Sequence, residues 1–174
     1  MLISQPMNDA INRQIGNEFG ASLQYVALAA HFDRESLPEL AAYFYRQGEE
    51  ERAHAMRFVK FVVDAGGRVE IPALPEPQSR FDTVEAAVRT ALDGEITVTR
   101  QINDLVDLAS RESDHITHST LQWFVTEQLE EVSSAETLLR IVQRAGEGGL
   151  LHVEEYLARR KSAPLTSEAG ANGR

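Results

Sequence analysis

The sequence predicts an all-α protein: a four-helix bundle with a long crossover between its second and third helices, followed by a short fifth helix. Three observations lead to this prediction. Apolar and small residues recur at alternating steps of four and three along four long segments, the spacing that keeps one helix stripe against a partner. A proline-rich stretch, residues 68–80, separates the second segment from the third. Many residues of the first half also recur 77 positions later, which indicates two matching helical hairpins.

The first helix is expected over roughly Pro6 to Arg34, with an inward stripe of Ile11, Ile15, Glu18, Ser22, Tyr25, Ala29 and Phe32. The second helix is expected to open at Ser36, which would form a capping box with Glu39, and to end at the glycine pair 66–67. Its inward stripe reads Leu40, Phe44, Gln47, Glu51, His54, Phe58, Phe61 and Ala65. Charged and imidazole side chains therefore stand where Leu or Phe is expected.

Residues 68–80 contain three prolines and are too rich in helix breakers to be helical, so they form the crossover. The third helix is expected to begin near Asp82, with Glu85 three residues on. Its stripe reads Val84, Val88, Ala91, Glu95, Val98, Ile102, Leu105 and Ala109. The fourth follows Ser113 and Asp114, ends at the glycines of residues 146–149, and has the stripe Leu121, Phe124, Gln128, Glu131, Ala135, Leu138 and Val142. Residues 150–160 predict a short fifth helix.

Length and composition fit one folded domain. The chain has 174 residues, of which 43% are hydrophobic, 25% charged and 7% aromatic. No apolar run is long enough to span a membrane, and a membrane is not an expected partner. We expect a domain over residues 1–161 and a disordered tail over residues 162–174, which are rich in Ser, Ala and Gly.

The charge balance and the lack of cysteine narrow the function. With 27 acidic and 17 basic residues the net charge is −10, so nucleic acid is not an expected partner and cations are. Zero cysteines exclude disulfides, thiolate zinc and Cys-ligated iron–sulfur clusters, which leaves oxygen and nitrogen ligands. Residues 1–8 have neither the basic segment nor the apolar stretch of a signal peptide, so we expect the protein to be located in the cytoplasm.

The repeat carries metal-ligand chemistry. Glu18, Glu51 and His54 recur 77 positions later in the residues Glu95, Gln128 and Glu131. Carboxylates that face a bundle core are costly unless they are paired, protonated or bound to metal. Their four negative charges would be balanced by two divalent ions, since no Lys or Arg lies in the stripes. Oxygen-rich ligation with a single imidazole suits iron or manganese better than copper.

Together these motifs resemble those of the bacterial non-haem ferritins. The resemblance rests on Asn-Glu-Phe-Gly-Ala-Ser-Leu-Gln-Tyr (17–25), Glu-Glu-Glu-Arg-Ala-His (49–54), Glu95, and Gln-Trp-Phe-Val-Thr-Glu-Gln-Leu-Glu-Glu (122–131). It covers all five expected helices and implies a ferritin-like bundle with a dinuclear iron centre. One iron would lie on Glu18, Glu51 and His54, and the other on Glu51, Glu95 and Glu131, so that Glu51 bridges them.

The resemblance also assigns residues around that centre. Glu50, Glu127 and Glu130 resemble the carboxylates that hold a third iron, although the same residues could be a solvated acidic face. Tyr25 resembles the family's redox-active tyrosine, although the same residue could equally be a core tyrosine with a satisfied hydroxyl. Bacterioferritins tend to carry a glutamate and a histidine where this chain has Gln128 and Glu131. No haem is expected, because Arg52 follows Glu51 where bacterioferritins carry the haem-ligating methionine.

The resemblance implies an iron-storage ferritin that oxidises Fe(II) with dioxygen and stores ferric mineral in a hollow shell of 24 subunits. Two alternatives remain open from the residues alone. One is an oxygen-activating diiron enzyme on the same bundle, such as a rubrerythrin-type peroxidase. The other is a metal-free helical interaction module whose inward glutamates share protons or waters.

Overall fold

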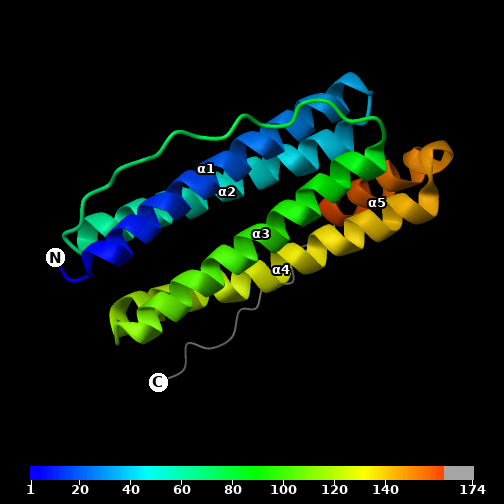
Figure 1. Cartoon of the computed structure of the whole chain (residues 1–174). Coiled ribbons are helices and arrows are strands. Elements are labelled where there is room, and N and C mark those ends of the chain that lie inside the picture. The colour runs from blue at the N-terminus through cyan, green and yellow to red at the C-terminus, as the bar shows by residue number, and fades with distance from the viewer. Residues whose placement is uncertain (163–174) are drawn as a thin grey trace.

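The computed structural model describes residues 1–162, and over this range the protein is an all-α bundle. It consists of α1 (Gln5–Arg34), α2 (Pro38–Asp64), α3 (Val84–Arg111), α4 (His115–Ala145), a 3₁₀ turn (Glu147–Gly149) and α5 (Leu150–Ser162). Figure 1 shows the four long helices side by side, with α5 against one end of the bundle. The expected fold is confirmed. Of the expected disordered tail, Ser162 closes α5 and residues 163–174 lie outside the described range.

The turns that join α1 to α2 and α3 to α4 repeat each other bond for bond. The N–H of Leu37 donates to the carbonyl of Phe32 at 3.0 Å, and 77 positions later the N–H of Asp114 donates to Ala109 at 2.8 Å. Both turns contain a serine with positive φ, Ser36 at 61° and Ser113 at 55°. This is the pairing of a Schellman motif, which ends a helix in a left-handed residue. The sequence repeat is thus a structural repeat.

The N-terminus of α2 differs from the prediction. Ser36 is not its cap and the expected box with Glu39 does not form, because Ser36 already closes α1 in the left-handed conformation. The capping position is Leu37, which offers no side-chain acceptor, whereas its repeat partner Asp114 accepts the N–H of residue 117. The missing acceptor comes from α5: the Glu154 carboxylate accepts the N–H groups of Glu39 at 2.8 Å and Leu40 at 2.9 Å.

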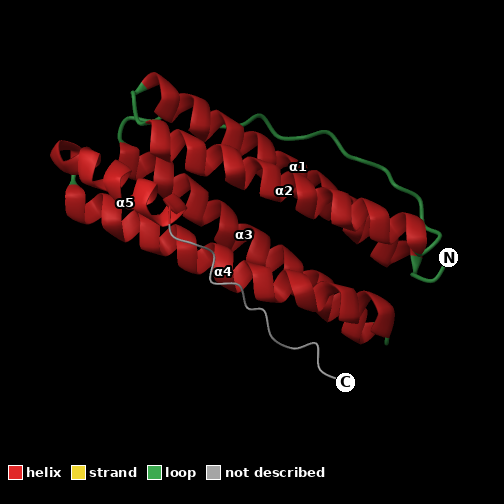
Figure 2. Ribbon diagram, turned by 180° about the vertical axis from the view of Figure 1, so that it is seen from behind, coloured by secondary structure: helices red, strands yellow, loops and turns green. Residues whose placement is uncertain are grey.

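The crossover lies along the outside of the α1–α2 hairpin for the length of the bundle (Figures 1 and 2). Small and amide residues of α1 hold it there. A Cβ added to Gly16 would lie 2.4 Å from Cγ of Pro72, so only glycine allows this approach. The Gln24 side chain donates to the carbonyl of Gln78 at 2.9 Å and accepts its N–H at 2.8 Å.

The N-terminus of α3 also differs from the expectation. The helix is capped by Thr83, whose hydroxyl accepts the N–H of Ala86 at 3.1 Å, and not by Asp82. Gly94 stands in the middle of α3, where glycine costs on the order of 1 kcal/mol relative to alanine. Apart from its chain neighbours and the adjacent backbone of α3, no heavy atom of the described chain lies within 4 Å of the position of an added Cβ at Gly94.

A polar layer divides the core into two apolar halves. One half lies at the α5 end of the bundle and includes Phe32, Phe44 and Val153, while the other includes Ile11, Phe58 and Phe124. Along every long helix the chain passes from one half to the other through buried polar residues, namely Glu18 and Ser22, Gln47, Glu51 and His54, Glu95, and Gln128 and Glu131. None of the helices in the described range is long and apolar enough to cross a membrane.

Candidate metal centre

The six residues of the predicted dinuclear site come from all four long helices and share the polar layer. Each is between 1% and 7% exposed. Glu18 lies on α1, Glu51 and His54 on α2, Glu95 on α3, and Gln128 and Glu131 on α4. The stripe pattern places them correctly, because a residue at helix spacing among core positions turns inward whether it is apolar or charged.

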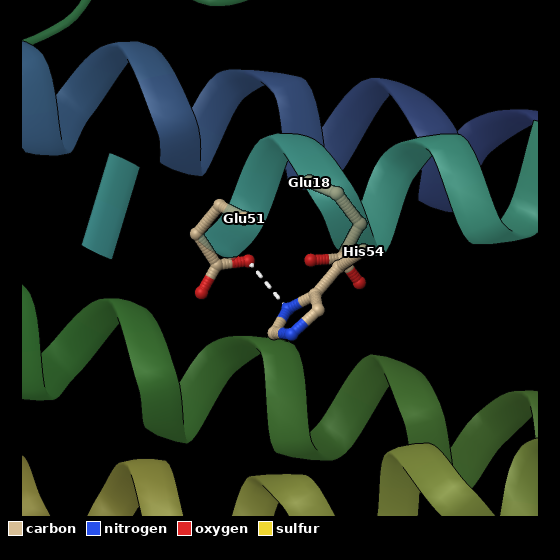
Figure 3. A group of neighbouring side chains, drawn as sticks. All are labelled: Glu18, Glu51 and His54. Atoms are coloured by element: carbon tan, nitrogen blue, oxygen red, sulfur yellow. Dashed lines mark hydrogen bonds and ion pairs between the residues drawn. The ribbon is translucent and has the colours of Figure 1, made fainter. Parts of the chain in front are cut away.

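The α1–α2 side of the layer holds a compact group of ligand atoms. Glu18, Glu51 and His54 each offer one atom, and these atoms lie within 4.8 Å of one another. Figure 3 shows the three side chains projecting from α1 and α2 toward the interior of the bundle, with the His54 Nδ1 3.2 Å from a Glu51 oxygen. The Gln14 amide donates to the other side of the group, to Oε1 of Glu18 at 2.9 Å.

On the α3–α4 side, Glu95 is the best connected residue. The Tyr25 hydroxyl donates to one oxygen of its carboxylate. The Thr99 hydroxyl lies 2.8 Å from the Glu95 carbonyl and 2.9 Å from the side-chain oxygen of Gln128, so it ties α3 to α4 at this level. Glu51, Glu95 and Glu131 do not together meet the 4.8 Å spacing that the first group meets.

Burial raises the pKa of every carboxyl group in the layer. Desolvation raises the pKa of Glu51 to about 8, with a further contribution from the charge of Glu95, and raises that of Glu131 to about 8, again helped by Glu95. The pKa of Glu18 lies well above its usual value because of burial and then the charge of Glu51. The pKa of Glu95 is raised by burial, against the opposing hydrogen bond from Tyr25. With pKa values of about 8, Glu51 and Glu131 favour the protonated form at neutral pH when no metal is bound.

Three buried oxygens of the layer have no hydrogen-bond partner: Oε2 of Glu18, Oε1 of Glu51 and Oε2 of Glu95. Buried acceptors are normally satisfied, so unpaired oxygens on three different helices need an explanation. Divalent cations provide one, because they coordinate carboxylate oxygen and release the protons that burial retains. The donor set, oxygen-rich with one imidazole, fits iron or manganese.

The outer carboxylates lie next to this layer. Glu50, Glu127 and Glu130 line a cavity of about 250 Å³ together with Glu131, between α2 and α4. Oxygen atoms of Glu127 and Glu131 also form a second group of ligand atoms within 4.8 Å, with a nitrogen of His54. The Gln47 amide donates to Glu50. The three residues expected at a third metal position are therefore brought together.

Comparisons with known proteins show to which family the chain belongs. A family model described as a ferritin-like domain matches residues 8–145. The chain belongs to the ferritin family. It is 46% identical to Ferritin BfrB of Mycolicibacterium smegmatis over 88% of this chain and 84% of that protein. It is 33% identical to a bacterial non-heme ferritin of Staphylococcus aureus, over 84% and 88%. An open-pore ferritin from the archaeon Archaeoglobus fulgidus superposes with a TM-score of 0.87 at 37% identity, covering 90% and 98%.

Several residues of this ferritin that support the centre were missed in the sequence. Gln14 lies four residues before Glu18 and Thr99 four residues after Glu95, and both contact the layer. Residues four apart share a helix face, so that spacing could have indicated them. Tyr43 faces the layer as well: burial and then Glu131 raise the pKa of its hydroxyl.

A wide groove of this ferritin leads from the surface to His54. It has a volume of about 820 Å³ and lies between α2 and α4, with His54, Glu50 and Glu127 among its lining residues. The Trp123 ring packs edge-on against His54 with centroids 5.4 Å apart, and the Arg57 guanidinium lies 3.9 Å from the centroid of Trp123. These contacts fix the imidazole plane from the groove side.

Proposed function

We propose that this protein is an iron-storage ferritin that oxidises Fe(II) with dioxygen at a dinuclear centre in each subunit and stores the ferric product as mineral in a hollow shell. Membership in the ferritin family supports iron storage. The observation that carries the oxidation step is the set of three unpaired buried carboxylate oxygens on α1, α2 and α3, beside His54.

In this proposal Fe(II) is the substrate. One ion is held by Glu18, Glu51 and His54, and the second by Glu51, Glu95 and Glu131, near the amide of Gln128. Each Fe(II) loses one electron, so a pair supplies the two electrons that, with two protons from water, reduce dioxygen to hydrogen peroxide. The protein contributes position and charge: it holds two cations at fixed places in a dry layer where its own carboxylates would otherwise keep protons.

The surrounding residues have proposed roles as well. Glu50, Glu127 and Glu130 hold a third ion on its way out of the dinuclear centre. Tyr25 is the redox-active residue, since its hydroxyl donates to Glu95. The protein works without haem and in the cytoplasm, and it assembles into a shell of 24 subunits. The neutral amide of Gln128 weakens the hold on the second iron, which suits a centre that passes its product on.

The test is oxidation and mineralisation by purified protein. Fe(II) is mixed with the protein in air, and ferric absorbance, oxygen uptake and particle mass are followed for the wild type and for Glu51→Ala. Asp93→Ala is the matched control, since it truncates an exposed carboxylate on α3. We expect the initial oxidation rate of Glu51→Ala to fall by roughly 10-fold or more, because both ions lose a ligand. Equal rates in wild type and Glu51→Ala would sink the oxidation proposal.

A further inference from the structure

α5 brings a basic side chain to the acidic cavity beside the dinuclear layer. Among the described residues that line this cavity, the charged ones from α2 and α4 are all glutamates: Glu50, Glu127, Glu130 and Glu131. Arg160 of α5 lines the same cavity and is its basic member. A guanidinium at this place sets the cavity apart from a simple carboxylate cluster.

The docking of α5 fixes where Arg160 lies. Val153 and Leu157 are buried in the core, and the Glu154 carboxylate accepts two N–H groups at the start of α2. Arg160 follows Glu154 by six residues, roughly 9 Å along the helix axis. Its Nη1 lies 3.4 Å from the hydroxyl of Tyr156, and its Cζ lies 5.9 Å from the centre of that ring. The charge is therefore held by a docked helix.

The field of this charge reaches the volume that the carboxylates share. Both the glutamate charges and the Arg160 charge act on the Tyr43 hydroxyl. Burial raises the pKa of this hydroxyl and the charges of Glu131 and Glu50 raise it further, whereas the charge of Arg160 lowers it. Tyr43 lines the cavity too, so the cation and the glutamates act at the same place.

We propose that Arg160 competes with metal ions for the outer carboxylates and so keeps their cavity a place of passage rather than of retention. Four glutamates without a nearby cation would hold a divalent ion tightly, whereas a positive charge on the cavity wall repels that ion and attracts the carboxylates. The inference rests on the proposed function, because the ion in passage is the iron that the dinuclear centre handles.

The experiment measures metal affinity without oxidation. Anaerobic calorimetric titration with Co(II) alone is carried out on the full chain for the wild type, Arg160→Gln, Arg160→Lys and Arg159→Gln. Arg159 is the matched control, since it is the exposed neighbour and pairs with Glu155. Each variant is repeated with Glu130→Gln, which removes an outer carboxylate and so identifies the outer binding step.

We expect the outer step to bind about threefold to tenfold tighter in Arg160→Gln, because a partly screened unit charge is removed near a divalent ion. Arg160→Lys and Arg159→Gln should keep the wild-type affinity, and the difference should shrink as salt is raised. An unchanged outer step in Arg160→Gln, an equal shift in Arg159→Gln, or the absence of any outer step would overturn the inference. Since Co(II) is not oxidised here, these outcomes are independent of whether the wild type oxidises Fe(II).

Discussion

At the residue scale, the polar layer shows how the surroundings of a carboxyl group set its pKa. Glu18, Glu51, Glu95 and Glu131 occupy ordinary core positions of four helices, but the desolvation they share raises each pKa. Gln14 donates to one oxygen of Glu18 and Tyr25 to one oxygen of Glu95, while the other oxygen of each carboxylate has no hydrogen-bond partner among the described residues. The layer thus has more buried acceptor oxygens than hydrogen-bond donors, and bound cations would satisfy the excess.

Replacing Tyr25 by Phe tests the donor to Glu95. The variant removes the hydroxyl that donates to one oxygen of a buried carboxylate whose other oxygen has no partner among the described residues, so we expect the free energy of unfolding of the metal-free protein to fall by about 1–3 kcal/mol. Urea unfolding followed by circular dichroism measures it. Tyr45→Phe is the control, because it removes a hydroxyl that binds Asp33 at the exposed surface, and it should cost less than about 0.5 kcal/mol.

The same variant examines the proposed redox role. Tyr25→Phe should slow the oxidation of Fe(II) while anaerobic Co(II) binding stays close to that of the wild type. An oxidation rate that matches the wild type would leave Tyr25 with a purely structural task.

At the element scale, two mid-helix glycines have opposite roles. Gly16 of α1 allows the crossover to approach, since an added Cβ would lie 2.4 Å from Pro72, whereas Gly94 of α3 faces open space in the described chain. We expect Gly16→Ala to lower the free energy of unfolding by about 1–3 kcal/mol through overpacking. Gly94→Ala should raise it by up to about 1 kcal/mol through helix propensity. Thermal unfolding of the pair checks both signs, and a stabilised Gly16→Ala would contradict the crossover packing.

The cap that α5 provides for α2 is a second test at this scale. Glu154→Ala removes the acceptor for two N–H groups at the start of α2, so we expect a loss of about 0.5–2 kcal/mol and faster hydrogen exchange at Glu39 and Leu40. Glu154→Gln keeps a carbonyl acceptor, so its free energy of unfolding should fall by less than that of Glu154→Ala. Glu155→Ala, at the exposed neighbour, should leave these amides unchanged, and equal exchange in all three variants would argue against the cap.

At the scale of the whole molecule, stability and the proposed metal binding depend on the same carboxyl groups. The folded-state pKa values of Glu51 and Glu131 are about 8, above the ordinary value of 4.5. A raised pKa means that the folded state binds protons more tightly, so the stabilisation is present below about pH 4.5 and is lost as the pH rises through about 8. Metal-free protein should therefore become less stable across this window.

We expect the melting temperature of the metal-free protein to be lower at pH 9 than at pH 6 by on the order of 5–10 °C. Anaerobic Mn(II) should restore stability most at the higher pH, because ions bind the deprotonated carboxylates. Scanning calorimetry at both pH values, with and without Mn(II), gives the comparison. The variant Glu51→Gln/Glu131→Gln should show a flatter pH profile, and an unchanged slope would assign the effect to other groups.

The sequence by itself determined the helices, the crossover and the inward position of the six residues of the polar layer. Each follows from local rules: stripe spacing, breakers, and a repeat whose partners keep the same helix face. Even the failure at Ser36 was local in origin, because one serine could close α1 or cap α2 and the sequence does not say which.

Only the tertiary structure decided which contacts form between elements that are far apart in the sequence. Glu154 caps α2 from 114 residues away, Arg160 reaches the acidic cavity, and Tyr25 meets Glu95 across two helices. The burial that raises the carboxyl pKa values likewise exists only once four helices enclose the layer. Helical periodicity fixes which way a side chain turns, but which groups it meets there, and whether water is excluded, depends on how the hairpins and α5 pack together.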